Sequence, residues 1–374
     1  MSLVGDIIDR VLFPNRELHA IPVLDGAFSP NQRLDLARQL GEQVERPDDL
    51  ALGPDGALYV SSGTVIIRCA AGDDFAQRTV FASFASPVGG LAWTADGRLI
   101  ACVSRQGLVA LSSAGVVVGR LENAGGEPIA CPTSVTVAVD GTIYATDGSR
   151  TNPPELWLTD LMQNRAASGR LISCGPDLSD AKARADKLAW PSGAVVSHDG
   201  KEVWVGESWA HRLTAFSRVG NRQRVIVKNY AGYPSRIVRG AAGDYWMAFF
   251  GVRTQLTEFV LREREFCEAM MKTVPPELWI GPTLDGRFNY REPTQIGRIK
   301  KLGIQKPWAP PRSYGLVARL NGDGEATESL HSRVDGRVHG VTAVGVVGAQ
   351  VLAASKGSNC LVVLPPSPSG ARKV

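Results

Sequence analysis

Three residues could carry acid-base chemistry and bind a charged substrate at a shared site: Asp48, Arg236 and His339. Asp48 follows Pro47 at the start of a predicted strand, so its carboxylate is either a general base or substrate anchor, or a cap for the turn. His339 could transfer protons near neutral pH, or could be a hydrogen-bonded core residue. Arg236 could bind a substrate carboxylate or phosphate through two hydrogen bonds, or pair with Asp48 and neutralise both charges.

A repeated β-hairpin has to position these residues. The stretch RPDDLALGPDGALYVSS, residues 46–62, places alternating apolar residues on both sides of a Pro-Asp-Gly turn, as a hairpin does. The same pattern returns at 88–104, 133–149 and 192–208, and in weaker form at 234–250 and 339–355. The six copies indicate that one structural unit is repeated along the chain.

The spacing of the copies predicts a single all-β domain, a six-bladed β-propeller. Most turn glycines are roughly 41 to 59 residues apart, close to the length of one blade. The last spacing, about 105 residues, requires an insertion. We expect a helical and irregular insertion at 253–313, between blades five and six, which is either a lid or a packing arm. Residues 1–45 are expected to form an N-terminal cap, with a helix ending at Pro14 and an extended, ring-closing segment at 17–30, and 46–374 to form the propeller.

Composition argues against several classes of function. The formal net charge is +4 with dispersed basic residues, whereas a nucleic-acid-binding surface needs a basic cluster. No stretch approaches the length of a membrane span, and the apolar N-terminal stretch is interrupted by charges. The six cysteines are scattered and form no CxxC pair, so we expect reduced thiols and a cytoplasmic protein. A closed propeller has no free sheet edge to pair, which favours a monomer.

Several motifs then resemble a known family. YATDGSR, SGRLISC, WPSGAVVSHDGKEVWVGESWAHRLTAFS, NYAGYPSRI, YWMAF and SYGLVARLNGDG follow one another as in strictosidine synthase-like proteins. Those proteins belong to the wider gluconolactonase/regucalcin-like group of six-bladed propellers. The resemblance covers roughly residues 44–364 and supports the predicted fold strongly, whereas function does not follow from fold.

The resemblance implies a divalent cation, usually Ca²⁺, on the propeller axis in the lactonase branch of the group. The corresponding positions here are Asp48, Thr133-Ser134, Ser192-Gly193 and Pro234-Ser235-Arg236. One carboxylate with a guanidinium nearby is an unfavourable environment for a dication, so Ca²⁺ is possible but not expected. Asp49 would be a second ligand only if it faced the axis, and strand alternation predicts that it does not.

The resemblance to strictosidine synthase itself implies a metal-free condensation of an amine with an aldehyde. In that enzyme the general acid/base is a Glu two residues after a His in the last blade. The matching segment here is His339-Gly340-Val341, in which the His is present and Val341 replaces the Glu. The sequence therefore does not predict that reaction as such.

The remaining candidates are expected to bind substrate. Thr133, Ser134, Ser192 and Ser235 supply hydroxyls where the family has ligands, and none lies in a Gly-x-Ser-x-Gly motif. Trp190 and Tyr233 could line an aromatic pocket, although packing between blades would explain them equally well.

These observations favour an enzyme acting on a small organic molecule in an axial pocket, by hydrolysis of a lactone or ester. Asp48, His339 and Arg236 would carry the chemistry without a tightly held metal. Two alternatives stay open: a metal-free enzyme that forms or breaks C–N or C–C bonds, and a non-catalytic binding or scaffold propeller. Convergence of the three residues in an open pocket would discriminate an enzyme from a scaffold.

Overall fold

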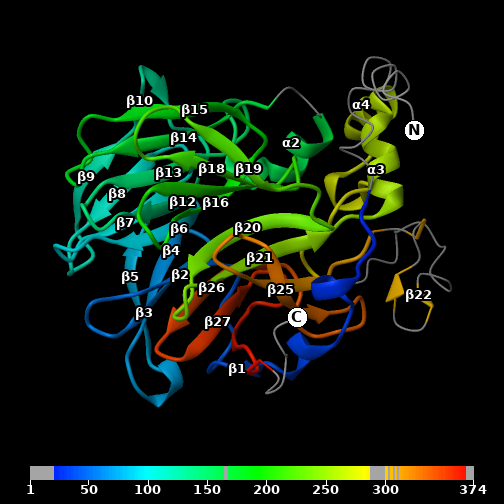
Figure 1. The fold of residues 1–374 in the computed structure, drawn as a ribbon, viewed down its shortest axis with the longest axis horizontal. Coiled ribbons are helices and arrows are strands. Elements are labelled where there is room, and N and C mark those ends of the chain that lie inside the picture. The colour runs from blue at the N-terminus through cyan, green and yellow to red at the C-terminus, as the bar shows by residue number, and fades with distance from the viewer. Residues whose placement is uncertain are drawn as a thin grey trace.

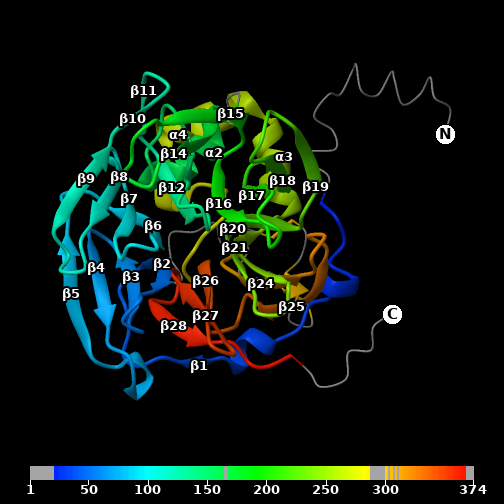
Figure 2. The same cartoon turned by 60° about the vertical axis from the view of Figure 1, so that its left-hand side comes forward.

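The structure is a computed structural model that describes residues 21–163, 167–286, 300–301, 304–305, 308–309 and 311–367. Six four-stranded antiparallel sheets dominate this part of the chain (Figure 1). Their innermost strands contact one another in a closed ring, visible in Figure 2: β2 (Pro47–Leu52), β6 (Val88–Trp93), β12 (Pro132–Val137), β16 (Pro191–Val196), β20 (Gly232–Arg239) and β26 (Val341–Val347). The predicted six-bladed β-propeller is therefore confirmed.

The first four blades follow the predicted hairpin pattern. In the first hairpin Gly56 adopts a positive φ of 75°, its N–H donates to the Gly53 carbonyl, and the Asp55 carboxylate accepts from the Ala57 N–H. The outer strands are β3 (Leu58–Ser62), β4 (Val65–Cys69) and β5 (Arg78–Ser83) in blade one; β7 (Leu99–Val103), β8 (Gly107–Leu111) and β9 (Val117–Leu121) in blade two; β13 (Ile143–Asp147), β14 (Gly169–Cys174) and β15 (Lys182–Leu188) in blade three; and β17 (Glu202–Glu207), β18 (Arg212–Ser217) and β19 (Gln223–Val227) in blade four.

Blade five is interrupted by the insertion, which corrects the predicted position between blades five and six. After β21 (Tyr245–Val252) the chain leaves the sheet, and it returns as β24 (Gly315–Leu320), which pairs with β21 and is followed by β25 (Ala326–Ser332). SYGLVARLNGDGEATESL thus supplies the two outer strands of blade five. The prediction failed because the turn at Asp323-Gly324 resembles the hairpin that begins a blade.

Short elements connect the blades and form the insertion. The insertion contains α3 (Gln255–Arg262), α4 (Arg264–Thr273), η5 (Pro276–Leu278) and a small pair of strands, β22 (Lys300–Lys301) and β23 (Ile304–Gln305). Elsewhere lie η1 (Gly26–Phe28), η2 (Arg33–Leu36), η3 (Asp73–Phe75), η4 (Pro154–Leu156), α2 (Trp157–Gln163), β10 (Asn123–Ala124) and β11 (Glu127–Pro128). No helix in the described part of the chain is long and apolar enough to span a bilayer.

A strand from the N-terminal segment closes the ring. Blade six contains β26, β27 (Gln350–Ser355) and β28 (Cys360–Val363), and β1 (Arg38–Gln39) pairs with β28 as its outermost strand. The closing strand lies within the predicted N-terminal cap, but at 38–39 instead of 17–30. The helix predicted to end at Pro14 lies outside the described residues.

The core consists of apolar layers between adjacent blades. One layer packs Trp246 and Val317 of blade five against Val344 and Ala353 of blade six. A separate cluster joins α2, α3 and α4 to the propeller, with Leu161, Met270 and Phe250 among its buried members. The three helices therefore lie together over one face of the propeller, at one end of the axis (Figure 1).

Candidate functional site

Each innermost strand begins with an irregularity that turns its first residues toward the axis. The pairing of all six with their neighbours shifts register within the first residues, for example between Pro47 and Leu50 in β2 and between Pro234 and Ile237 in β20. A bulge leaves residues unpaired and changes the direction of their side chains. Side chains from six blades are thereby brought to a common centre.

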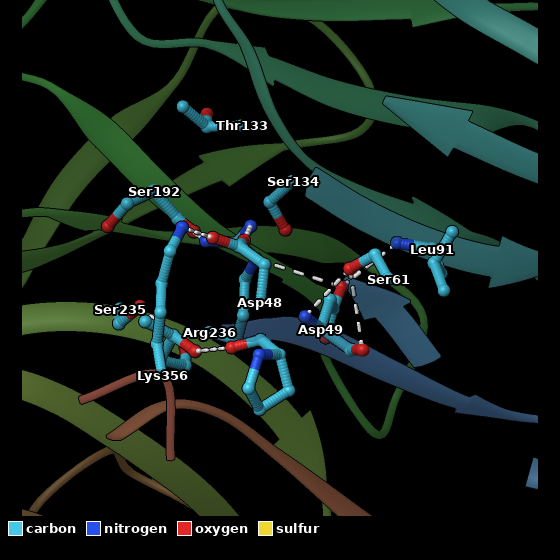
Figure 3. A network of polar contacts seen from close by, with 12 residues as sticks. Asp48, Asp49, Ser61, Leu91, Thr133, Ser134, Ser192, Ser235, Arg236 and Lys356 are labelled. Carbon is cyan, nitrogen blue, oxygen red and sulfur yellow. Dashed lines mark hydrogen bonds and ion pairs between the residues drawn. The ribbon is translucent and has the colours of Figure 1, made fainter. Parts of the chain in front are cut away.

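An ion cluster occupies that centre (Figure 3). The Arg236 Nη2 donates to Asp48 Oδ1 at 2.5 Å, and its Nη1 donates to the Ser192 carbonyl oxygen at 3.1 Å. The Lys356 ammonium forms an ion pair with Asp48 Oδ2. The pairing of Asp48 with Arg236 across the axis, one of the two roles considered for Arg236, is present in the structure.

The two cations control the acidity of Asp48. Burial alone would raise the pKa of Asp48, but the Lys356 ammonium and the Arg236 guanidinium outweigh burial and lower that pKa below its usual value. Burial opposes the charge of Arg236 as well, and the neighbouring carboxylates outweigh it and raise the pKa of Arg236. Asp48 is therefore ionised, both of its oxygens are engaged, and it is a weak base.

Asp49 lies beside Arg236, which corrects the prediction from strand alternation. Its Oδ2 is 3.7 Å from the Arg236 Nε, and its two oxygens accept the N–H groups of Leu50 at 2.8 Å and Leu91 at 2.9 Å. Alternation failed because the register shift after Pro47 allows consecutive residues to approach the same guanidinium. Burial raises the pKa of Asp49 to about 6 against the effect of Arg236.

A cavity of about 230 Å³ opens beside the cluster, on the face covered by the helices. Its floor contains Asp48, Arg236 and Lys356, and the remaining lining residues are Arg46, Gly63, Pro87, Val88, Gly89, Thr133, Pro154, Glu155, Trp157, Trp190, Ser192, Ser235, Phe250, Leu284 and Thr342. We call it the axial pocket. A second cavity, about 380 Å³, is lined by Asp49, Ser134 and Arg236 among others, so Arg236 contributes to both cavities.

Aromatic side chains form much of the wall. Trp190 stacks on Trp209 with 5.2 Å between ring centroids, and Trp157 meets Phe250 edge to face at 5.4 Å. Of the two aromatic candidates from the sequence, Trp190 lines the axial pocket. Tyr233 is instead fully buried and stacks on Phe250 at 5.3 Å.

The insertion contributes to the same wall. Leu284, which follows η5, lines the axial pocket, as do Glu155 and Trp157 from the excursion after β13. The described part of the insertion therefore packs against the propeller and also contributes Leu284 to the pocket wall.

The four predicted hydroxyls divide between the two cavities. Thr133, Ser192 and Ser235 line the axial pocket, and their hydroxyls donate to the carbonyl oxygens of neighbouring blades at 2.6 to 2.7 Å. Ser134 lines the second cavity and accepts the Ala194 N–H at 3.2 Å. Because these bonds cross from blade to blade, the hydroxyls fix the geometry of the axis.

His339 does not line the axial pocket. Its Nε2 lies 2.7 Å from the Arg333 carbonyl oxygen and its Nδ1 2.7 Å from the Ser313 hydroxyl. A carbonyl only accepts, so Nε2 donates and Nδ1 accepts from Ser313. Burial lowers the pKa of His339, so the ring is neutral near pH 7. The structure joins Asp48 and Arg236 but leaves His339 apart.

Lys356 is the functional candidate that the sequence did not indicate. It follows β27 directly, in the last blade, and its backbone N–H donates to the Gly340 carbonyl at 3.0 Å. A lysine in a turn is ordinarily exposed, and no motif distinguishes this one. Only the closure of the ring brings blade six beside blade one, where Asp48 lies.

The residues on the axis do not fit the Ca²⁺ that the resemblance implies. A calcium site needs six to eight oxygen ligands with carboxylates free to coordinate. Here both Asp48 oxygens bind cationic side chains, and Arg236 and Lys356 would repel a dication. Among the described residues no group of three or more His, Cys, Asp or Glu side chains is arranged to hold a metal ion.

Comparisons with known proteins agree with the resemblance. A model of the strictosidine synthase-like N-terminal region matches residues 26–65. Protein STRICTOSIDINE SYNTHASE-LIKE 6 of Arabidopsis thaliana is 28% identical over 160 residues, 42% of this chain and 43% of that protein. The adipocyte plasma membrane-associated protein of Salmo salar is 25% identical over 252 residues, 62% of this chain and 60% of that protein. The match thus spans less than two thirds of either relative.

Solved structures show the same fold. A gluconolactonase from Xanthomonas campestris superposes with a TM-score of 0.58 and 17% identity, over 89% of this chain and 91% of that one. A regucalcin from Agrobacterium tumefaciens, described as calcium-binding, gives a TM-score of 0.56 and 13% identity, over 88% and 92%. The chain is a propeller of this architecture, and its residues 26–65 are similar to the strictosidine synthase-like N-terminal region. At these identities the structural likeness establishes the fold alone.

Proposed function

We propose that the axial pocket binds a small organic molecule and hydrolyses a lactone or ester there, with side-chain cations as hydrogen-bond donors to the carbonyl oxygen. The observation that carries the proposal is the position of Lys356 and Arg236 at the floor of a cavity with aromatic walls. A few convergent polar groups in a largely apolar cavity are typical of small-molecule sites. Hydrogen-bond donors fixed in such a site stabilise the oxyanion that forms when water adds to a carbonyl.

In this proposal Lys356 and Asp48 have different roles. Lys356 donates to the carbonyl oxygen, water adds to the carbonyl carbon, and the ester C–O bond breaks to give a carboxylic acid and an alcohol. Asp48 holds both cations in place. Because its pKa is lowered, Asp48 accepts a proton from water only weakly, so activated esters and strained lactones are the expected substrates.

One observation favours non-catalytic binding as a second candidate. Both Asp48 oxygens are engaged in ion pairs, and His339 lies outside the pocket, so no strong general base lines the floor. Amine condensation is less favoured than either, because Lys356 and Arg236 would repel a protonated amine or iminium.

Hydrolysis of a panel of aryl esters and of five- and six-membered lactones, followed by pH-stat, tests the proposal. A lactone panel is apt because one fold neighbour is described as a gluconolactonase. Lys356→Met is expected to lower kcat/KM by about 100-fold, the usual effect of losing one oxyanion donor. The matched control Lys201→Met removes a lysine that is 80% exposed, and activity should not change. Absence of hydrolysis above background with every member of the panel would overturn the proposal.

A further inference from the structure

Lys356 has donors to spare in the axial pocket. An ammonium carries three N–H groups, and within the described residues Asp48 Oδ2 is the acceptor found for it. Its side chain is 25% exposed and lines the pocket, so it is not enclosed by protein. Two donors therefore remain available for an acceptor group of a ligand.

The charges around the pocket leave a positive excess. Glu155, at the wall, accepts from the Ser104 hydroxyl at 2.8 Å and pairs with Arg105 at 3.1 Å, so its charge is already balanced. Among the described residues that line the pocket, the charged side chains are the cations Arg46, Arg236 and Lys356 and the carboxylates Asp48 and Glu155. The excess of one positive charge is compensated when one negative charge binds beside Lys356.

The aromatic part of the pocket wall can hold a flat apolar group. Trp190 has a φ of 52°, a conformation that bulky residues rarely adopt and that persists only where the surroundings impose it. Trp190 as a residue is only 5% exposed yet lines the pocket, and Trp209 stacks on its ring. Trp157 and Phe250 face the same cavity. The backbone strain therefore fixes an aromatic surface in the pocket wall.

We infer that the axial pocket selects small aromatic carboxylates, with the ring against Trp190 and the carboxylate on the Lys356 ammonium. This inference rests on the axial pocket being the ligand site of the proposed function, and it names the chemical class that the site prefers. The cavity of about 230 Å³ is smaller than the roughly 300–1,000 Å³ of drug-sized sites, so a ligand with one ring fits the space. A carboxylate product of ester hydrolysis carries the same charge.

Isothermal titration calorimetry with three probes of matched shape tests the inference. Phenylacetate carries the carboxylate, phenylacetamide is its neutral counterpart, and phenethylamine carries a positive charge. We expect phenylacetate to bind at least tenfold more tightly than phenylacetamide, and phenethylamine to bind more weakly than both. Equal affinity for phenylacetate and phenylacetamide, or tighter binding of the amine, would overturn the inference.

Variants of Lys356 assign the preference to this residue. Lys356→Met should abolish the difference between phenylacetate and phenylacetamide, whereas Lys356→Arg should keep it, because Arg retains the charge. Lys201→Met is the control for loss of a lysine elsewhere, and a thermal melt confirms that each variant is folded. A folded Lys356→Met that still prefers phenylacetate tenfold would refute the assignment.

The outcome is separable from that of the hydrolysis assay. Hydrolysis without a carboxylate preference would remove this inference and leave the proposed function standing. A carboxylate preference that depends on Lys356, without hydrolysis of any ester or lactone, would support the inference and remove the catalytic proposal.

Discussion

Replacing Arg236 by methionine removes the guanidinium that lies between the carboxylates of Asp48 and Asp49, of which Asp49 is buried, while keeping most of the side-chain volume. Asp48 would retain the Lys356 ammonium, but Asp49 would lose the cation 3.7 Å from its Oδ2. Removing one partner of a buried ion pair typically costs about 3–5 kcal/mol, because the other charge stays buried and unpaired. We expect a loss of this size in the free energy of unfolding at pH 7.5.

The loss in the free energy of unfolding should be smaller in acid, because Asp49 can take up a proton there. Burial raises the pKa of Asp49 to about 6, and Arg236 opposes that rise, so the pKa increases further without the guanidinium. At pH 5.5 the native variant then carries a neutral Asp49 and no unpaired buried charge there. Each pKa unit corresponds to 1.36 kcal/mol, so the loss should shrink by about 1–2 kcal/mol between pH 7.5 and 5.5.

Urea denaturation at the two pH values measures both effects. Arg38→Met is the matched control, since Arg38 pairs with Asp74 at 2.6 Å but is 50% exposed, and an exposed pair contributes about 0–1 kcal/mol. The reasoning would be refuted if Arg236→Met cost no more than Arg38→Met at pH 7.5, or if its cost were the same at both pH values.

Two further predictions concern the scaffold. Burial lowers the pKa of His331 to about 4, so stability should fall as pH drops from 6.5 toward 4, by up to about 3 kcal/mol. Protonation of Asp49 changes the stability in the opposite direction over the same pH range. The contribution of His331 is therefore the difference between wild type and His331→Gln in the pH slope of the free energy of unfolding, measured by urea denaturation. Equal slopes for the two proteins would contradict the prediction. Gly193→Ala would place a Cβ 2.1 Å from the Ser235 carbonyl oxygen and should lower the melting temperature strongly, whereas Gly119→Ala meets nothing closer than 3.6 Å and should be tolerated. Similar melting temperatures for the two variants would show that the contact at Gly193 relaxes.

The blade pattern could be predicted from the sequence because it is local. Alternation around a turn glycine, which follows an Asp in the first four copies, specifies each hairpin without knowledge of its neighbours, and the structure contains all six hairpins. The order of strands beyond the insertion is not local. The pairing of β24 with β21 joins segments on either side of the insertion, and the turn at Asp323-Gly324 carries no information about which blade it serves.

The site was only partly predictable for a related reason. The start of a predicted strand indicates Asp48, the resemblance at 234–236 indicates Arg236, and the structure pairs them. Asp49 was misplaced because alternation assumes regular pairing, and the register shift in β2 removes that assumption. Lys356 was not identified because its proximity to Asp48 depends on the last blade returning beside the first.

The bulged starts of the innermost strands explain how one scaffold can hold different chemistries. They direct side chains from six blades to the axis whatever those side chains are, so the chemistry depends on residue type alone. Carboxylates and amides there would hold a divalent cation. In this chain Arg236 and Lys356 supply the positive charge themselves, and Asp48 is the anion that holds them. A tethered cation cannot be removed by a chelator, but it acts only by charge and hydrogen bonds and does not acidify water as a metal ion does. Under the proposed function, chelators should therefore leave hydrolysis unchanged, and the substrates should be those whose carbonyl needs little activation.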